Sequence, residues 1–211
     1  MKGKPFAAEL IGTFVLVFIG AGAAAMAAGR LVGVALAHGL ALMVVVYSYG
    51  HISGAHINPA VTFGLALAGA IDWVRAAGYW LAQFLGGILA AAALSYLLGG
   101  SDSGLGATTL ADGVSPLQGL ALEAILTFFL VNTVLHAAVA GKAGQFAGMA
   151  IGLTLAFSIL MGGPLTGASL NPARTLGPAL LTGGLAEFWI YLVGPFAGGA
   201  LAAAAYQFLK D

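Results

Sequence analysis

The 211-residue chain contains no cysteine and very little charge. The absence of cysteine excludes disulfides, thiol catalysis and thiolate metal sites. Only 7% of the residues are Asp, Glu, Lys or Arg, whereas an ordinary soluble domain has about 25%. The formal net charge is zero, so the composition gives no reason to expect nucleic acid as a partner. With 61% hydrophobic residues and a mean hydropathy of +1.02, the chain is predicted to be an integral membrane protein.

The motifs of common enzymes are also missing. The sequence has no phosphate-binding glycine loop that ends in Lys-Ser or Lys-Thr, no nucleophile elbow and no pair of catalytic carboxylates. His51, His56 and His136 lie near the ends of apolar runs or in loops, and no cluster has the spacing of metal ligands. We therefore expect structural histidines, no enzyme activity, and no metal or other cofactor.

Six apolar runs carry almost no charge and are long enough to cross a hydrocarbon core of ~30 Å as helices. They cover residues 10–29, 31–50, 76–101, 116–141, 145–163 and 188–209. The first run follows two lysines and resembles a signal peptide, but its 20 residues are sufficient to span the membrane. The sequence thus predicts an all-α membrane protein with six transmembrane helices.

Two short stretches between these runs repeat each other. They read Ser-Gly-Ala-His-Ile-Asn-Pro-Ala-Val at 53–61 and Thr-Gly-Ala-Ser-Leu-Asn-Pro-Ala-Arg at 166–174. Asn58 and Asn171 are suited to cap a helix, and Pro59 and Pro172 fit its first turn. A helix of about ten residues is ~15 Å long and covers roughly half of the membrane. Both stretches are therefore predicted to be re-entrant half-helices, whose irregular backbone must be covered by protein or line a wet cavity.

The repetition extends along the whole chain. The segment around Glu9 matches the one around Glu123 at an offset of 114, and Gly86-Gly87 matches Gly198-Gly199 at an offset of 112. Each unit has three spans, and because this number is odd, the second unit lies upside down relative to the first. The half-helices therefore enter from opposite faces and meet with their N-termini at the midplane. The predicted inverted repeats cover about 1–100 and about 114–211 of one channel domain, residues 1–211.

The positive charges predict the orientation. If the N-terminus is cytoplasmic, five Lys or Arg residues lie on that side and the outer loops carry only Arg30. Arg174 is left out of this count because it lies within the second re-entrant stretch. The cytoplasmic set is Lys2, Lys4, Arg75, Lys142 and Lys210. We therefore expect both termini in the cytoplasm and the protein in the cell membrane, either an inner or a plasma membrane.

Two helix N-termini that meet at the midplane place positive dipole ends there, and Asn58 and Asn171 add amide donors. Water can offer its oxygen to these groups, whereas a cation or a migrating proton meets an electrostatic barrier. Glu9 and Glu123 occupy equivalent places in the two units. An intramembrane carboxylate can serve as a proton relay. Their symmetrical placement favours a structural role as buried acceptors for the backbone of the re-entrant loops.

On these residues the chain resembles the aquaporin, or major intrinsic protein, family over essentially its whole length. The resemblance rests on both Asn-Pro-Ala motifs, on the sequence from His51 to Thr62, and on Arg174, which follows only the second motif. It implies a passive water channel of prokaryotic type in the lipid bilayer. It also implies a homotetramer with one pore in each subunit.

Arg174 is the candidate filter residue with the strongest argument from the sequence. The first unit has Val61 in its place, and a charge within the membrane is costly unless it serves a pathway. The resemblance places Arg174 in an outer constriction with His38, Ile159 and Ala168. The family's narrow water pores combine an aromatic residue, a His and a Thr or Cys with the Arg. The present set is instead similar to that of plant vacuolar aquaporins, some of which pass ammonia or urea, so we expect a somewhat wider pore that admits water and ammonia. The competing interpretation of His38 is a packed core histidine.

Two other functions remain open. A glycerol facilitator of the same family typically has Asp after the Arg and a basic residue four positions later, where this chain has Thr175 and Ala179. Leu192 is nevertheless facilitator-like. A proton-coupled secondary transporter can also have inverted repeats, and Glu9 and Glu123 would be its only ionisable candidates.

Overall fold

The structure is a computed structural model and describes residues 3–27 and 29–210. In this part of the chain there are six helices of membrane-spanning length and no strand, which confirms the predicted fold class. The long helices are α1 (Lys4–Ala25), α2 (Arg30–Ser53), α4 (Trp73–Leu97), α5 (Pro116–Thr133), α6 (Ala147–Thr166) and α8 (Phe188–Leu209). A π-helical segment, η2 (Val134–Val139), continues α5. The half-helices are α3 (Pro59–Leu67) and α7 (Pro172–Thr182), and the short 3-10 turns are η1 (Gly104–Gly106), η3 (Gly144–Phe146) and η4 (Leu185–Glu187).

Several predicted boundaries differ from the structure, because an uncharged run is a poor guide to where a membrane helix ends, and the first two helices show this. Helix α1 begins at Lys4 rather than at residue 10, and therefore includes Glu9. This carboxylate is fully buried and hydrogen-bonded, so its charge does not end the helix. Helix α2 continues beyond residue 50 to Ser53, where Gly54 ends it with a left-handed backbone.

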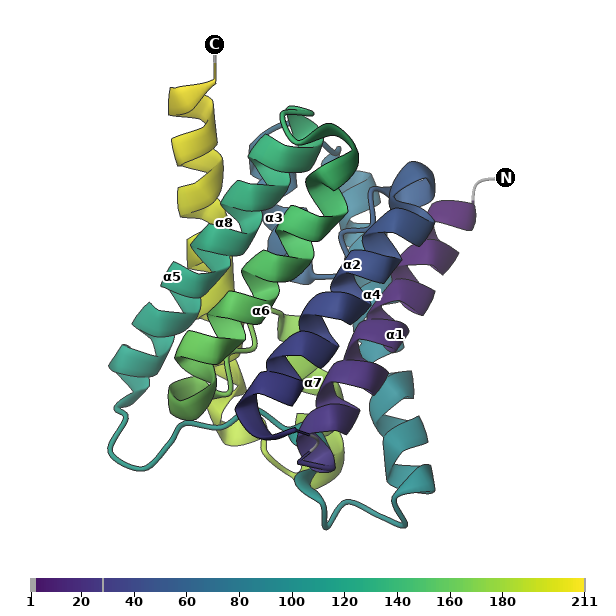
Figure 1. Cartoon of the computed structure of the whole chain (residues 1–211), viewed down its shortest axis with the longest axis vertical. Coiled ribbons are helices and arrows are strands. Elements are labelled where there is room, and N and C mark those ends of the chain that lie inside the picture. Colours follow the sequence, from purple (N-terminus) through teal and green to yellow (C-terminus); the bar gives the residue numbers. More distant parts are fainter. Residues whose placement is uncertain (1–2, 28, 211) are drawn as a thin grey trace.

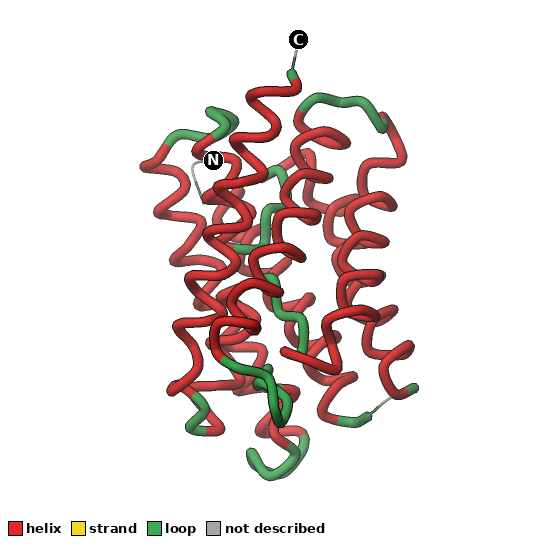
Figure 2. Tube along the Cα trace, turned by 90° about the vertical axis from the view of Figure 1, so that its left-hand side faces the viewer, coloured by secondary structure: helices red, strands yellow, loops and turns green. Residues whose placement is uncertain are grey.

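The long helices run side by side, and both termini lie toward the same end of the molecule (Figure 1). Helix α1 packs against α2 and α4, and α5 packs against α6 and α8. The contact between α2 and α6 joins these two groups. Half-helix α3 lies toward the end that carries the termini, and α7 lies toward the opposite end. Figure 2 shows loop segments that enter the interior of the helical bundle instead of staying at its ends.

Glycine pairs hold each half-helix against a long helix of the other unit. A Cβ on Gly177 of α7 would collide with the carbonyl oxygen of Gly87 in α4. A Cβ on Gly64 of α3 would lie 3.0 Å from the carbonyl oxygen of Gly199 in α8. Small residues at such positions let backbones approach closely inside a membrane. This cross-packing brings the N-termini of α3 and α7 together.

Candidate functional site

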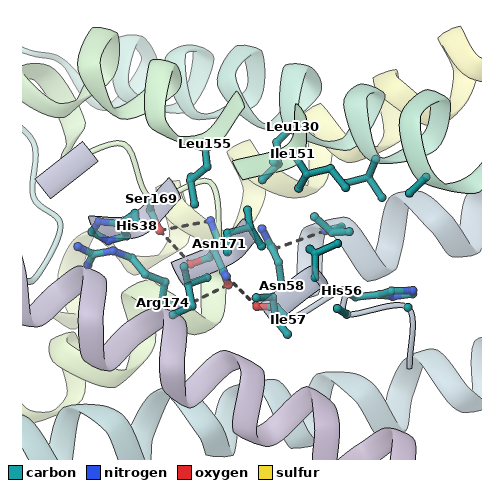
Figure 3. Close-up of a pocket in the computed structure, with 18 residues that line it drawn as sticks. His38, His56, Ile57, Asn58, Leu130, Ile151, Leu155, Ser169, Asn171 and Arg174 are labelled. Atoms are coloured by element: carbon teal, nitrogen blue, oxygen red, sulfur yellow. Dashed lines mark hydrogen bonds between the residues drawn. The ribbon is translucent and has the colours of Figure 1, made fainter. Parts of the chain in front are cut away.

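A cavity follows the middle of the bundle, between the two re-entrant loops on one side and apolar side chains on the other (Figure 3). The apolar part of its wall includes Leu16, Leu42, Leu130, Val134, Ile151 and Leu155. The polar part comes from His38, His56, Asn58, Ser169, Asn171 and Arg174. A second, wider cavity shares Val46, Gly54, His56, Val134 and Ala138 with the first, so the two form one passage.

Asn58 and Asn171 lie at the centre of this passage and tie the two loops together. The Asn58 side-chain oxygen accepts from Ala60 N at 2.8 Å and Val61 N at 3.5 Å, which caps α3. Asn171 caps α7 through Ala173 N at 3.0 Å and Arg174 N at 3.3 Å. Each side-chain amide also donates across the midplane, Asn58 to Leu170 O at 2.8 Å and Asn171 to Ile57 O at 3.0 Å. These bonds leave one N–H of each amide free for a molecule in the cavity.

Two buried carboxylates hold the loops from behind. Glu9 accepts from His56 N at 2.9 Å and Ile57 N at 2.6 Å, and also from Ser53 and Gln83. Glu123 accepts in the same pattern from Ser169 N at 3.0 Å, Leu170 N at 2.7 Å and the Thr166 hydroxyl. Each bonded N–H would otherwise remain unsatisfied away from water, which costs about 1–3 kcal/mol.

The same loops contain left-handed backbone conformations that could not be predicted from their residue types. Ala55 and Ile57 have φ of +48° and +43°, and the equivalent Ala168 and Leu170 have +45° and +56°. A left-handed conformation is rare for residues other than glycine and costs about 1–3 kcal/mol each. The hydrogen bonds to Glu9 and Glu123 oppose this cost, so the carboxylates and the strained loops are parts of one arrangement.

His38 and Arg174 lie together at one end of the first cavity, and His56 lies at its other end, where the second cavity begins (Figure 3). Arg174 is 3% exposed, and its Nη1 donates to Gly106 O at 2.6 Å. In the described part of the chain it forms no ion pair, and its Nε has no partner. The contact of His38 Nδ1 with Val34 O, at 2.9 Å, requires Nδ1 to carry the proton because a carbonyl oxygen only accepts. Neutral His38 therefore has an Nε2 acceptor without a hydrogen-bond partner, and Arg174 has an Nε–H donor without one.

The other two predicted filter residues are buried close to this region. Ile159 of α6 and Ala168 of the second loop belong to one apolar cluster, which also includes Ala35 of α2. Neither residue is part of the cavity wall. The structure therefore brings His38 and Arg174 together at the passage and places Ile159 and Ala168 in the apolar cluster that also supplies wall residues such as Leu16 and Leu155.

His56, which was predicted to be structural, and Ser169, for which no role was predicted, both line the passage. They occupy the same place in the two units, two residues before the capping Asn. His56 Nδ1 contacts the Thr62 hydroxyl at 3.2 Å, and Ser169 Oγ contacts the equivalent hydroxyl of Thr175 at 2.6 Å. The missed signal is this polar residue at the same position of both motifs.

The passage thus combines one apolar wall with a line of polar groups, and two helix N-termini meet at its centre. Such a surface offers hydrogen bonds to small neutral molecules along one side only. The positive dipole ends at the centre disfavour cations.

Comparisons with known proteins agree with this geometry. The profile of the Major intrinsic protein family matches residues 2–206. Aquaporin NIP1-1 of Zea mays is 43% identical over 209 residues, a match that covers 96% of this chain and 73% of the relative. Probable aquaporin TIP3-2 of Arabidopsis thaliana is 45% identical over 222 residues, covering 96% of this chain and 82% of the relative. Among solved structures, the aquaglyceroporin from Plasmodium falciparum superposes with a TM-score of 0.87 at 27% identity, covering 99% of this chain and 97% of that one.

Proposed function

Because this chain belongs to the major intrinsic protein family and is therefore a multi-pass membrane channel, we propose that it conducts water passively, excludes protons and also passes ammonia. The observation that carries this proposal is the midplane, where Asn58 and Asn171 cap two opposed half-helices and keep one amide N–H each for the solute. A water molecule that accepts from both amides has both of its lone pairs occupied, so it cannot accept a proton from a neighbouring water molecule.

Proton exclusion follows from the same arrangement. Each half-helix N-terminus is equivalent to about half of a positive charge, so a hydronium ion at the midplane would face two such ends. The fixed charge of Arg174 adds to this barrier at one end of the passage. Barriers of this kind are the accepted explanation for aquaporin-type pores.

His38, Ile159, Ala168 and Arg174 are proposed to form the selectivity filter. The unpartnered His38 Nε2 and Arg174 Nε–H offer one acceptor and one donor, which suits water and ammonia equally well. Ile159 and Ala168 contribute apolar surface behind them, and the small Ala168 side chain leaves more room than Thr or Cys would. The ammonia permeability rests on this filter, whereas the water permeability rests on the midplane.

A glycerol facilitator is the second candidate. The observation in its favour is the close superposition on a protein described as an aquaglyceroporin. Against it, sequence identity is higher to plant aquaporins, for example 46% over 214 residues to Aquaporin TIP4-4 of Zea mays. Thr175 also stands where a facilitator typically has Asp.

We further propose a homotetramer in the cell membrane with both termini in the cytoplasm. The termini share one end of the molecule, and that end also carries Arg75 and Lys142. The two units, about 1–100 and about 114–211, are proposed to form one channel domain. Apolar side chains on the outer faces of α1, α2, α5 and α6 supply surface for lipid or for neighbouring subunits.

Stopped-flow light scattering on proteoliposomes tests the proposal when water, glycerol and ammonia permeabilities are measured in one preparation. We expect fast water and ammonia fluxes and glycerol flux close to that of empty vesicles. Fast glycerol flux would instead assign the chain to the facilitators. Ammonia flux equal to that of empty vesicles would remove the ammonia part and leave the water channel.

A further inference from the structure

The loop between α4 and α5 folds back into the protein beside the candidate filter. Leu105 is fully buried and has φ of +48°, a left-handed conformation that is unfavourable for leucine. It packs with Val17, Ala21 and Leu94. The next residue, Gly106, supplies the carbonyl oxygen that accepts from Arg174. This strained turn therefore brings the loop backbone to the charged end of the passage.

The loop makes a second contact, from the buried Thr108 side chain to the residue after Arg174. Thr108 Oγ1 lies 2.9 Å from Thr175 Oγ1, which lies 2.6 Å from Ser169 Oγ. Ser169 Oγ in turn lies 2.9 Å from Asn171 O. Three buried hydroxyls thus form one line from the loop to the backbone of the midplane asparagine.

The direction of every bond in this line can be deduced, because each hydroxyl has a single proton. Asn171 O can only accept, so Ser169 uses its proton there. Thr175 must then donate to Ser169, and Thr108 must donate to Thr175. Ser169 Oγ also accepts from Asn171 N at 3.3 Å, so its proton and both lone pairs are used within the protein. Thr108 is the one residue of the line that supplies a proton without receiving one from the other two.

The first unit satisfies the equivalent threonine differently. Thr62, the counterpart of Thr175, receives a hydrogen bond from Gln83 Nε2 at 2.9 Å and contacts His56. At the offset of 112 that relates the glycine pairs, the counterpart of Gln83 is Pro195, which has no side-chain donor. Thr108 of the loop thus fills the place that a helix residue occupies in the first unit.

We propose that Thr108 is a positioning residue for the candidate filter. Its hydroxyl and the Gly106 carbonyl attach the loop to two consecutive residues, Arg174 and Thr175, and so hold the guanidinium at a fixed distance from His38. Loss of the Thr108 donor leaves a buried Thr175 acceptor unsatisfied and loosens this end of the passage. Larger neutral solutes such as urea and glycerol then gain access relative to water. This inference rests on the proposed role of Arg174 in the filter.

The test compares Thr108→Val, which keeps the shape and removes the donor, with Thr108→Ser, which keeps the hydroxyl. Thr109→Val on the same loop is the matched control, because Thr109 is exposed. Urea and water permeabilities are measured in the same proteoliposomes, and their ratio does not depend on the amount of folded protein. For Thr108→Val we expect the ratio to rise about threefold or more, the factor expected for one hydrogen bond. Thr108→Ser and Thr109→Val should retain the wild-type ratio.

Thr175→Val interrupts the line at its middle and provides a second route if Thr108→Val is poorly folded. It should raise the same ratio, and adding Thr108→Val to it should have little further effect, because both changes remove one interaction. The inference is overturned if both variants lower water and urea permeability in equal proportion, or if Thr109→Val changes the ratio as much. A wild-type protein that conducts glycerol rapidly would contradict the proposed water selectivity, yet the effect of Thr108→Val on the ratio would still be measurable.

Discussion

Arg174 shows how a single side chain distinguishes two otherwise equivalent sites. Its backbone N–H bonds to the capping oxygen of Asn171, as the N–H of Val61 bonds to that of Asn58. Both positions are buried in the first turn of a half-helix. The fold therefore accepts valine at this place, so the packing of the first turn of α7 does not require the charge of Arg174.

Arg174→Val tests this separation of fold and pathway. We expect the variant to fold, because Val61 already occupies the equivalent turn, and to admit urea at least about tenfold faster, as a loss of ~1.4 kcal/mol from the barrier would produce. A proton leak should appear in vesicles loaded with a pH-sensitive dye. The control is Lys4→Val, since Lys4 is exposed at the start of α1 and lines neither cavity. Unchanged urea flux and an absent leak in Arg174→Val would contradict the filter assignment.

The position of Ala168 relative to the passage can be tested separately, because the chain has no cysteine. Wild-type water flux should be insensitive to mercurials. Ala168→Cys should become sensitive if residue 168 faces the solute, and we expect at least about a threefold loss of water permeability, since a mercury adduct obstructs a pore that is one solute wide. Ser103→Cys, on the exposed surface of the outer loop, should remain insensitive. Insensitivity of Ala168→Cys, with labelling confirmed by mass spectrometry, would remove Ala168 from the filter.

At the scale of elements, features that depend on neighbouring residues could be predicted from the sequence, whereas contacts between distant residues mostly could not. Asn followed by Pro predicts the start of α3 and of α7, and an apolar run predicts each long helix, because each of these signals is formed by residues that are close together in the sequence. The left-handed backbone at Ile57 and the Thr108–Thr175 contact depend on residues that are distant in sequence. No local pattern marks them, and the same is true of the cavity wall. Only the equivalence of the two units, as for Glu9 and Glu123, indicated partners at long range.

The packing of α7 against α4 gives a prediction for one element. Gly177→Ala would place a methyl group against the backbone of Gly87, and overpacking of this kind costs about 1–3 kcal/mol. We expect a lower melting temperature in detergent and slower water flux, because the displaced half-helix carries Arg174. Gly50→Ala in α2 is the control for the melting temperature, since a methyl group there meets open space. Equal melting temperatures for the two variants would show that α7 is not tightly held.

For the whole molecule, the two units explain why a short chain can build a continuous passage. Each half-helix crosses only half of the bundle, and each packs on a helix of the other unit through glycine. The membrane class and the six spans follow from composition alone, since few charges and long apolar runs leave no other class. Solute selectivity does not follow from composition, because it depends on which few side chains meet at the passage.

The roles of Glu9 and Glu123 in the whole molecule distinguish a channel from a proton-coupled transporter. In a transporter a carboxylate must exchange its proton during the cycle, and Glu9 and Glu123 are the intramembrane candidates. Both instead accept hydrogen bonds from consecutive backbone N–H groups of the loops, and a proton on either carboxylate would occupy one of these acceptor positions. We therefore expect water and ammonia fluxes in proteoliposomes to be equal in both directions. An imposed pH gradient should cause no accumulation of urea. The ammonia measurement is corrected for trapping as ammonium. Urea accumulation that collapses when a protonophore is added would instead establish coupling to protons and would require one of these carboxylates to leave its loop.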